Sequence, residues 1–202
     1  ASALQETVER HNAEHLVILT NGSVKGHIRS ALPKQLTERV VDMLPYERSH
    51  EPEQLFSQLD PLMREVERQQ EQELLERLET QLATKGGLAF AGELSIAHAL
   101  HKGQIDTLLL SASYVGGTGS ECVECGSLWP GQLESCPYDG GELRRVDFRE
   151  GLVRHTLRQG GRIEVLGIEG ALEQHGGVAA ILRFRDDVGQ EVGGVITGDG
   201  IA

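Results

Sequence analysis

Three cysteines and one aspartate form the sharpest chemical pattern in the sequence. Cys122 and Cys125 belong to a Cys-x-x-Cys-Gly segment, and ten residues (126–135) separate it from Cys136, which opens a Cys-x-x-Asp-Gly segment. Two Cys-x-x-Cys turns across a short hairpin make a zinc ribbon, because each tight turn aims two thiolates at one point. Asp139 takes the place of the fourth cysteine, and a carboxylate also ligates zinc. The four residues are a candidate zinc site, and four protein ligands would make it structural.

A metal-free hairpin is the alternative interpretation. Aspartate lowers the affinity of a site whose selectivity comes from thiolates, and packing around Leu128 and Trp129 would hold a degenerate ribbon without metal. In either case the ribbon adds no catalytic group. Three cysteines this close together suit a metal site in a reducing cytosol better than a disulfide framework, which favours a cytoplasmic protein.

No other residues are spaced for catalysis. The eight histidines include no pair in a zinc-protease pattern, and His98 and His101, three apart, are expected to pack rather than to bind metal. No serine lies in a Gly-x-Ser-x-Gly turn, and Asn21-Gly22-Ser23 lacks the lysine and the glycine spacing of a phosphate loop. The sequence therefore predicts no catalytic residue and no cofactor-binding residue, and it leaves open whether the protein is an enzyme.

The charge distribution limits the partners. The net charge is -12, and each half of the chain, divided at Thr84, carries -6, so strong binding to free nucleic acid is not expected. Six of the ten basic residues in the second half fall within residues 144–162. They are either the solvated flanks of an amphipathic helix or a small patch for a ribosomal or GTPase surface. No apolar run approaches the ~20 residues that a bilayer requires, so no membrane association is expected.

Residues 1–82 are expected to form one α/β unit that precedes the ribbon. Apolar runs at 15–20 and 40–44 predict two strands, each preceded by helical sequence, and Ser23 is a candidate N-cap for a helix through Leu32. Residues 52–84 predict two helices, broken where Asp60 caps and Pro61 takes the first helical position. The second helix carries one apolar stripe on an otherwise solvated rod.

Residues 83–187 are expected to form a second α/β unit that carries the ribbon as an insertion at 120–142. Strands are predicted at 88–90, 105–110, 163–166 and 178–184, with helices at 92–102, 146–159 and 170–175. The alternation predicts parallel sheets with helical crossovers. The strands of Leu108, Val165 and Ile181 should share one sheet. Residues 188–202 are glycine-rich and are interpreted as a tail.

Two segments of the second unit resemble a known family. Residues 86–109 run in the order glycine pair, strand, glycine, helix, Ala-Leu-x-x-Gly and leucine-rich strand, and residues 176–184 read Gly-Gly-Val-Ala-Ala-Ile-Leu-Arg-Phe. With the cysteine insertion between them, this order resembles the C-terminal domain of the archaeal and eukaryotic class-1 peptide chain release factors and of Pelota, especially their bacterial release-factor-like relatives. The resemblance covers roughly residues 73–184. Residues 15–82 look, less strongly, like the latter part of that family's RNase H-like central domain.

The resemblance implies a fold and a setting. The second unit would be a three-layer α/β/α domain similar to kink-turn-binding ribosomal proteins, with an inserted zinc-ribbon-like hairpin, and the first would be a partial RNase H-like domain. The implied partners are the ribosome or a translational GTPase. Release factors carry a Gly-Gly-Gln loop in the central domain, and this sequence contains none; Gln159-Gly160-Gly161 has the reverse order in another domain. The segment after Gly92 also lacks the Asn and Lys pattern of kink-turn binders.

The predicted function is therefore that of a release-factor-like translation protein, in termination or ribosome rescue. The chain would be a positioning and docking module without a catalytic motif. Two alternatives stay open. One is a peptidyl-tRNA or nucleic-acid hydrolase whose active loop lies upstream of this fragment, and the other is a protein-interaction module that has lost the translation role.

Overall fold

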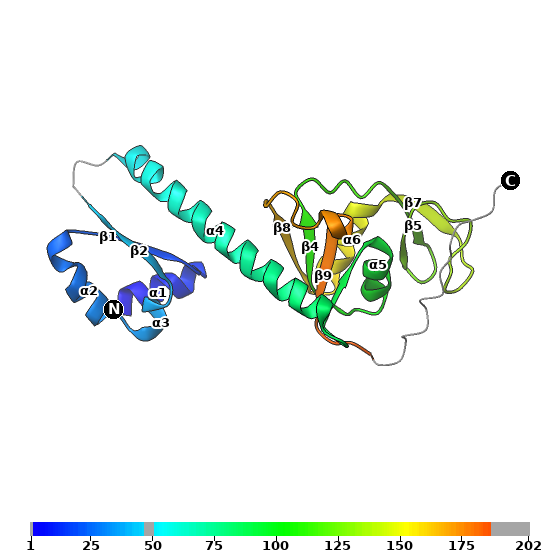
Figure 1. The fold of residues 1–202 in the computed structure, drawn as a ribbon, viewed down its shortest axis with the longest axis horizontal. Helices are drawn as coiled ribbons and strands as arrows, with labels where there is room; N and C mark the ends of the chain where they lie inside the picture. Colours follow the sequence, from blue (N-terminus) through cyan, green and yellow to red (C-terminus); the bar gives the residue numbers. More distant parts are fainter. Residues whose placement is uncertain (1, 47–50, 187–202) are drawn as a thin grey trace. The chain divides into compact units, whose positions relative to one another are not determined.

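The computed structural model describes residues 2–46 and 51–186 (Figure 1). The predicted tail at 188–202 lies outside these residues. The chain forms two compact units, which meet between Gln70 and Glu71. None of the helices in the described ranges combines the length and apolar character needed to cross a bilayer.

The first unit is a small α/β assembly around two parallel strands. Val8, Leu36 and Met43 are its buried apolar side chains, and the Lys25 ammonium donates a hydrogen bond to the Met43 carbonyl at 2.9 Å. Strand β1 pairs with β2 from Leu16 opposite Val40 onward. The elements are α1 (Ser2–His11), β1 (Leu16–Thr20), the 3-10 turn η1 (Gly22–Val24), α2 (Lys25–Ala31), α3 (Lys34–Thr37) and β2 (Val40–Pro45).

The helix expected from Ser23 to Leu32 is shorter than predicted. Ser23 lies inside η1, no side chain caps α2, and the helix ends at Ala31. Leu32 is extended, with φ -77° and ψ 134°. The cause is Pro33, whose ring disfavours helical backbone at the residue before it.

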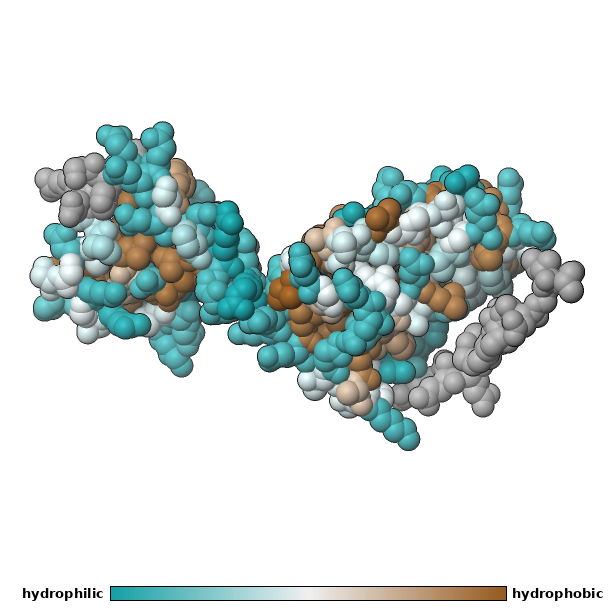
Figure 2. All heavy atoms as spheres, turned by 45° about the horizontal axis from the view of Figure 1, so that its top comes forward, coloured by the Kyte–Doolittle hydropathy of each residue, from teal (hydrophilic) through white to brown (hydrophobic). Residues whose placement is uncertain are grey.

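Helix α4 (Pro52–Ala83) is one continuous helix of 32 residues with Pro61 in its interior. The predicted break at Asp60-Pro61 is wrong. A proline removes one helical hydrogen bond, but the glutamate, glutamine, arginine and leucine residues on both sides are strong helix formers and sustain the helix across the gap. Asp60 pairs with Arg64 one turn later, at 3.0 Å, instead of capping a new helix. Hydrophilic side chains cover the face of the middle of the helix that is visible in Figure 2.

The second unit is built on a four-stranded sheet in the order β3-β9-β4-β8. Leu108, Val165 and Ile181 lie in this one sheet, as predicted, with Leu110 opposite Val165 and Thr107 opposite Ile181. The strands are β3 (Ala89–Ala91), β4 (Ile105–Ser111), β8 (Arg162–Leu166) and β9 (Val178–Leu182).

The expectation of parallel pairing is confirmed for β1 with β2 and for β4 with β8, but it is wrong for β9. β8 runs parallel to β4, but β9 runs antiparallel to both β4 and β3. A parallel return needs a long crossover, usually a helix, whereas the segment between β8 and β9 contains only the 3-10 turn η2 (Glu173–His175). After β8 the chain therefore turns back, and β9 inserts between β3 and β4 in the antiparallel direction.

Helices cover both faces of this sheet. Successive residues of β4 point to opposite faces, so Leu108 and Leu110 pack in a different cluster from Leu109. Helices α5 (Glu93–His101) and α6 (Phe148–Arg158) contribute apolar side chains to the cluster that contains Leu108 and Leu110. The last turns of α4 contribute to the cluster that contains Leu109, in which Leu78 is fully buried. The result is an α/β/α arrangement of three layers.

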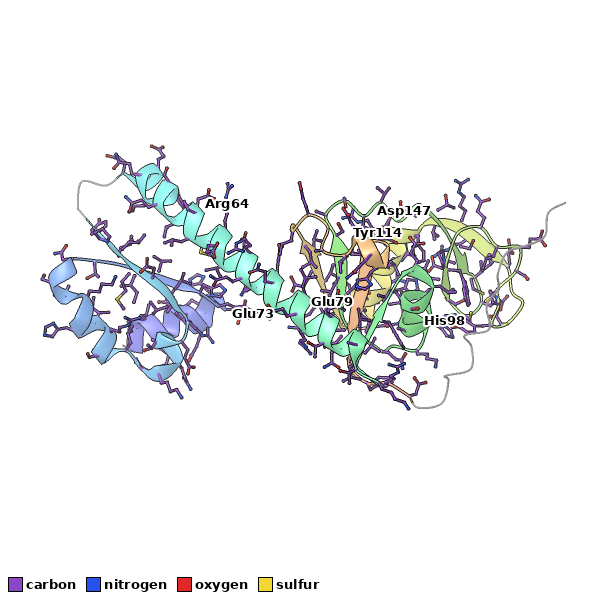
Figure 3. The ribbon with its side chains drawn as sticks, in the orientation of Figure 1. Arg64, Glu73, Glu79, His98, Tyr114 and Asp147 are labelled. Atoms are coloured by element: carbon purple, nitrogen blue, oxygen red, sulfur yellow. The ribbon has the colours of Figure 1, made fainter. Side chains whose placement is uncertain are left out.

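Two glutamates of α4 hold the second unit's loops. The Glu71 carboxylate accepts hydrogen bonds from the backbone amides of Gly167 and Ile168, each at 3.1 Å. Glu79, labelled in Figure 3, contacts the His175 imidazole at 2.9 Å. The C-terminal part of α4 is therefore integral to the second unit.

We expect Leu78→Ala to destabilise the second unit by about 2–5 kcal/mol, because it opens a cavity under the sheet. Arg77→Ala, on the exposed side of the same helix turn, should change stability by no more than about 0.5 kcal/mol. Urea unfolding followed by the fluorescence of Trp129, the one tryptophan of the chain, measures both. Equal midpoints for the two variants would show that α4 does not cover the sheet.

Candidate metal centre

A second, three-stranded antiparallel sheet carries the cysteines. It is inserted between β4 and α6 and has the order β6-β5-β7, with β5 at Thr118–Cys122, β6 at Leu128–Pro130 and β7 at Leu143–Asp147. Two glycines allow it to lie close to α6. A Cβ at Gly119 would come within 2.9 Å of the Phe148 ring, and one at Gly151 would come within 2.8 Å of Leu128. The insertion, here called the ribbon, is thus packed on the core of the second unit.

The first tight turn of the ribbon starts where β5 ends. The Gly126 amide donates to the Cys122 carbonyl at 3.1 Å, and the Cys122 amide donates to the Ser127 carbonyl at 2.9 Å. The Cys125 amide points at the Cys122 sulfur, 3.5 Å away. Gly126 has a φ of +71°, which glycine adopts without strain.

The second turn repeats both backbone–backbone hydrogen bonds of the first. The Gly140 amide donates to the Cys136 carbonyl at 2.8 Å, the Cys136 amide donates to the Gly141 carbonyl at 3.0 Å, and Gly140 has a φ of +73°. In this repeat Asp139 occupies the position that Cys125 holds in the first turn. The aspartate therefore stands where the second cysteine of a Cys-x-x-Cys turn would stand, in two turns with the same backbone hydrogen bonds.

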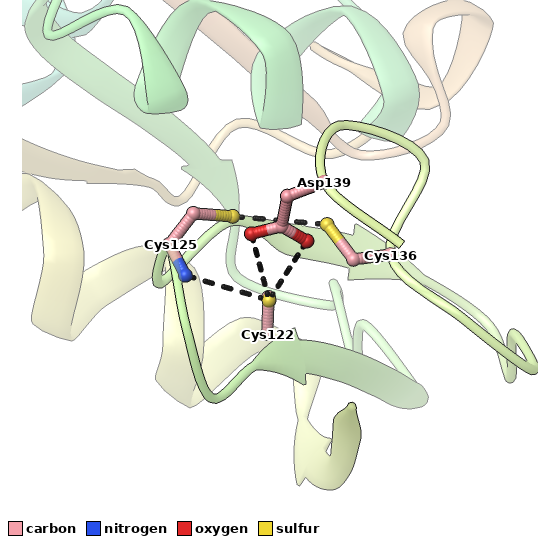
Figure 4. Close-up of side chains that lie close together, drawn as sticks. All are labelled: Cys122, Cys125, Cys136 and Asp139. Atoms are coloured by element: carbon pink, nitrogen blue, oxygen red, sulfur yellow. Dashed lines mark hydrogen bonds between the residues drawn. The ribbon is translucent and has the colours of Figure 1, made fainter. Parts of the chain in front are cut away.

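The structure brings all four predicted site residues together. The ligand atoms of Cys122, Cys125, Cys136 and Asp139 lie within 4.8 Å of one another. The Cys125 and Cys136 sulfurs are 3.7 Å apart, and the Cys122 sulfur lies 3.5 and 3.6 Å from the two Asp139 oxygens (Figure 4). Zinc–sulfur bonds of 2.3 Å in a tetrahedron place the sulfurs about 3.8 Å apart. The donor set and its spacing thus fit a tetrahedral zinc ion.

The electrostatics of the turns favour a charged aspartate. The Gly141 amide, 2.9 Å from an Asp139 oxygen, and the neighbouring thiols lower the pKa of Asp139 to about 2. Burial raises the pKa of Cys125 to about 11. Burial acts the same way on Cys136, but hydrogen bonds from Ser127 and from the backbone outweigh it and lower the pKa of that thiol. A bound cation would favour the thiolates of all three cysteines.

Ser127 lies behind two of the sulfurs, and the sequence pattern did not identify it. Its buried hydroxyl oxygen is 3.2 Å from the Cys125 sulfur and 3.2 Å from the Cys136 sulfur. The Trp129 indole N–H donates to the same oxygen at 2.9 Å. The indole occupies the hydroxyl as an acceptor, so the serine proton is free to point at a sulfur. In the sequence, the one feature that could have identified Ser127 is its position directly after Cys125-Gly126.

An aromatic cluster joins the second turn to α5. The His98 imidazole, labelled in Figure 3, lies 2.5 Å from the Tyr138 hydroxyl, and the His101 ring stacks on the Tyr138 ring at 4.1 Å. The Trp129 ring meets His98 edge to face at 5.2 Å. Burial lowers the pKa of His98. The two histidines pack against aromatic rings, as the sequence analysis expected.

Glu121 ties the ribbon to α6. Its side chain is only 4% exposed and contacts Arg144 at 2.8 Å, Arg154 at 2.6 Å and His155 at 2.8 Å. Burial acts to raise the pKa of Glu121, but the hydrogen bonds from these basic side chains outweigh it and lower the pKa. Part of the basic segment at 144–162 therefore neutralises a buried carboxylate, which neither interpretation of that segment anticipated.

We expect Glu121→Gln to destabilise the second unit by about 2 kcal/mol at neutral pH, because charge-assisted hydrogen bonds become neutral ones. The folded pKa lies below the unfolded value of about 4.3, so the stabilisation is present at neutral pH and is lost as the pH falls through the folded pKa. The difference in unfolding free energy between wild type and variant should therefore shrink as the pH falls below about 4.3 and through the lowered folded pKa. Glu142→Gln, at the exposed residue just before β7, should leave the unfolding free energy close to that of the wild type at every pH. A pH-independent loss would contradict the charge argument.

Comparison with known proteins places this geometry in a family. Residues 68–186 match the family model described as eRF1 domain 3. Peptide chain release factor subunit 1 of Pyrococcus abyssi is 24% identical over 213 residues, covering 88% of this chain and 51% of the relative. The same protein from Archaeoglobus fulgidus is 28% identical over 153 residues, covering 68% and 37%. The chain spans about half the length of the curated relatives it matches, or less.

Solved structures share the fold at low identity. A structure of ribosome-bound archaeal Pelota with ABCE1 matches with a TM-score of 0.60 and 19% identity, covering 91% of this chain and 47% of that one. Dom34 of S. cerevisiae, a translation termination-like factor involved in RNA quality control pathways and interacting with Hbs1, matches with a TM-score of 0.51 and 15% identity, covering 85% and 47%.

The family match includes the second half of α4 and runs through β9, so it contains the four-stranded sheet, both of its helical layers and the ribbon. It covers more than half of the chain and agrees with the resemblance of residues 86–109 and 176–184. The chain belongs to the eRF1 domain 3 family through a release-factor-like domain at residues 68–186, is similar to archaeal peptide chain release factor subunit 1, and shares its fold with Pelota.

Proposed function

We propose that this chain is a docking and positioning module of a cytoplasmic translation protein that acts in termination or ribosome rescue. The observation that carries the proposal is the match of residues 68–186 to the release-factor domain, on a unit with both sheet faces covered. The likeness to a ribosome-bound Pelota and to Dom34, which interacts with Hbs1, supports the ribosome and a translational GTPase as partners.

We further propose that the first unit is part of an RNase H-like central domain. Its parallel β1–β2 pair, with α2 and α3 between the strands, supports this assignment. In release factors the central domain carries the Gly-Gly-Gln loop, and this sequence has no such tripeptide. Positioning, rather than hydrolysis, is therefore the role proposed for the residues in hand.

The exposed arginines at 144–162 would contribute the charged part of the docking surface. Arg154 is largely covered and engaged with Glu121, while Arg145 and Arg158 are exposed. Glu93, at the start of α5, accepts a hydrogen bond from the Tyr114 hydroxyl at 2.8 Å. Kink-turn binders use the corresponding helix start to hold RNA, and the negative charge of Glu93 would oppose phosphate binding there. The docking surface would therefore recognise its partner through protein contacts and complementary shape as well as through charge.

We expect the chain to cosediment with ribosomes, to bind free RNA weakly and to release no peptide from peptidyl-tRNA. Cosedimentation at physiological salt, filter binding and a peptidyl-tRNA release assay measure the three properties. Exchanging Arg145 and Arg158 for glutamate should weaken ribosome binding several-fold, whereas Arg64→Glu with Arg77→Glu, an equal change of charge on α4, should not.

Two outcomes would favour the alternatives. Peptide release by this chain, or only by a version extended upstream, would point to a hydrolase. A folded protein that shows no ribosome binding at low or physiological salt would point to an interaction module outside translation.

We also propose that the ribbon holds a structural zinc ion through Cys122, Cys125, Cys136 and Asp139. Protein purified without chelator should contain about one zinc per chain, and Asp139→Cys should raise the zinc affinity because a fourth thiolate restores the softer ligand set. Glu134→Cys, which adds a thiol outside the cluster, is the matched control. A zinc ratio near zero, with no gain for Asp139→Cys, would support the metal-free ribbon.

A further inference from the structure

We propose that Cys125 and Cys136 form a thiol–disulfide site that peroxide oxidises, while Cys122 remains reduced. The inference does not depend on whether the ribbon holds zinc, since it uses the arrangement of the sulfurs alone. It assigns the ribbon an oxidant-sensitive modification in addition to any structural role.

Two of the three cysteines are in direct sulfur–sulfur contact. The Cys125 and Cys136 sulfurs are 3.7 Å apart and come from different turns of the ribbon. A disulfide bond is about 2.05 Å long, so the two sulfurs need to approach by about 1.7 Å. Glycines with positive φ, Gly126 and Gly140, follow the ligand position of each turn, and no atom lies within 4 Å of where their side chains would begin. Because glycine backbone torsions change at little cost, the two turns can adjust to bring the sulfurs together.

Cys122 is engaged differently. Its thiol faces both oxygens of Asp139, at 3.5 and 3.6 Å, and its sulfur also accepts a hydrogen bond from the Cys125 amide. It is buried at the end of β5, where its own amide is bonded to the Ser127 carbonyl. Cys122 is thus held by backbone and carboxylate contacts, although its sulfur also lies within 4.8 Å of the other two.

Access to the pair comes from Cys125, which is exposed, whereas Cys136 is buried. We therefore expect a small oxidant to reach the pair from the Cys125 side. Ser127, 3.2 Å from both sulfurs, lies on the buried side.

The chemistry balances with peroxide as the oxidant. One sulfur of the pair attacks hydrogen peroxide, the O–O bond breaks, and a sulfenic acid and one water form. The second sulfur attacks the first, the S–S bond forms, the S–O bond breaks, and the hydroxyl leaves as water with the second thiol's proton. Two thiols are oxidised and one peroxide is reduced to two waters.

Oxidation removes two of the four proposed metal ligands. A disulfide sulfur is not a thiolate and does not replace one as a zinc ligand. Zinc and the disulfide therefore exclude each other, and zinc should protect the pair from peroxide. Formation of the disulfide should also alter the environment of Trp129, because its indole N–H donates a hydrogen bond to the Ser127 hydroxyl, which contacts both sulfurs.

The test uses the full chain, reduced, stripped of metal with a chelator and treated with hydrogen peroxide. We expect free thiols to fall from three to one per chain and the mass to fall by about 2 Da. Cleavage after glutamate separates the cysteines onto peptides 122–124, 125–134 and 135–142. Peptides 125–134 and 135–142 should be linked, and 122–124 should carry the free thiol. Digestion at mildly acidic pH suppresses thiol exchange.

Matched variants keep the result interpretable. Cys122→Ser should form the same link with the same change in Trp129 fluorescence, and dithiothreitol should reverse both. Cys125→Ser and Cys136→Ser should lose that link. Their circular dichroism spectra show whether the fold is retained.

Three outcomes would overturn the proposal. These are a dominant link to peptide 122–124, a link only between chains, and sulfinic or sulfonic acids without a link. The zinc proposal is tested separately by metal analysis of the reduced protein. If zinc is absent, the disulfide experiment is unchanged; if zinc is present, added zinc should slow the loss of thiols relative to the chelated sample.

Discussion

Strand β4 is apolar on both of its faces, and the rest of the second unit is arranged to cover it. Leu108 and Leu110 require a layer on one side and Leu109 requires a layer on the other, because a strand of this kind is stable only when both faces are removed from water. Helices α5 and α6 provide one layer. The other is the last part of α4, whose glutamates also hold the loops beneath the sheet.

The ribbon depends on that core. It leaves the sheet after β4 and returns at α6, and two contacts hold it there: the buried Glu121 with its basic partners, and the aromatic cluster against α5. A buried carboxylate that is fully paired orients the groups around it, although a buried ion pair in itself adds little net stability. The three sulfurs consequently lie on a part of the ribbon that is anchored to the core. Binding of a ligand or oxidation at the turns would therefore also affect the side chains that pack against α5.

The features that could be predicted from sequence were those with strong local patterns. The apolar runs of β4, β8 and β9 and the repeated Cys-x-x-Cys-Gly and Cys-x-x-Asp-Gly turns follow from spacing alone. The helical break at Pro61 was predicted from a residue preference that the surrounding helix formers override. The direction of β9 depends on how far an eleven-residue connection can reach, which no periodicity reports. The partners of Glu121 lie 23 to 34 positions away in the sequence, so no local pattern identifies them. Ser127 is distinguished from other serines by its two sulfur neighbours, which become visible only in the folded structure.

The two edges of the four-stranded sheet limit how this domain can meet other proteins. β3 is only three residues long, and β8 places the charged side chains of Arg162 and Glu164 at the surface of the opposite edge. Short or charged edges discourage a further strand from pairing with a sheet. Neither edge is therefore suited to recruiting a partner by backbone pairing, so recognition is left to helix faces, loops and the ribbon, where selectivity resides in side chains and in the shape that the core imposes on them.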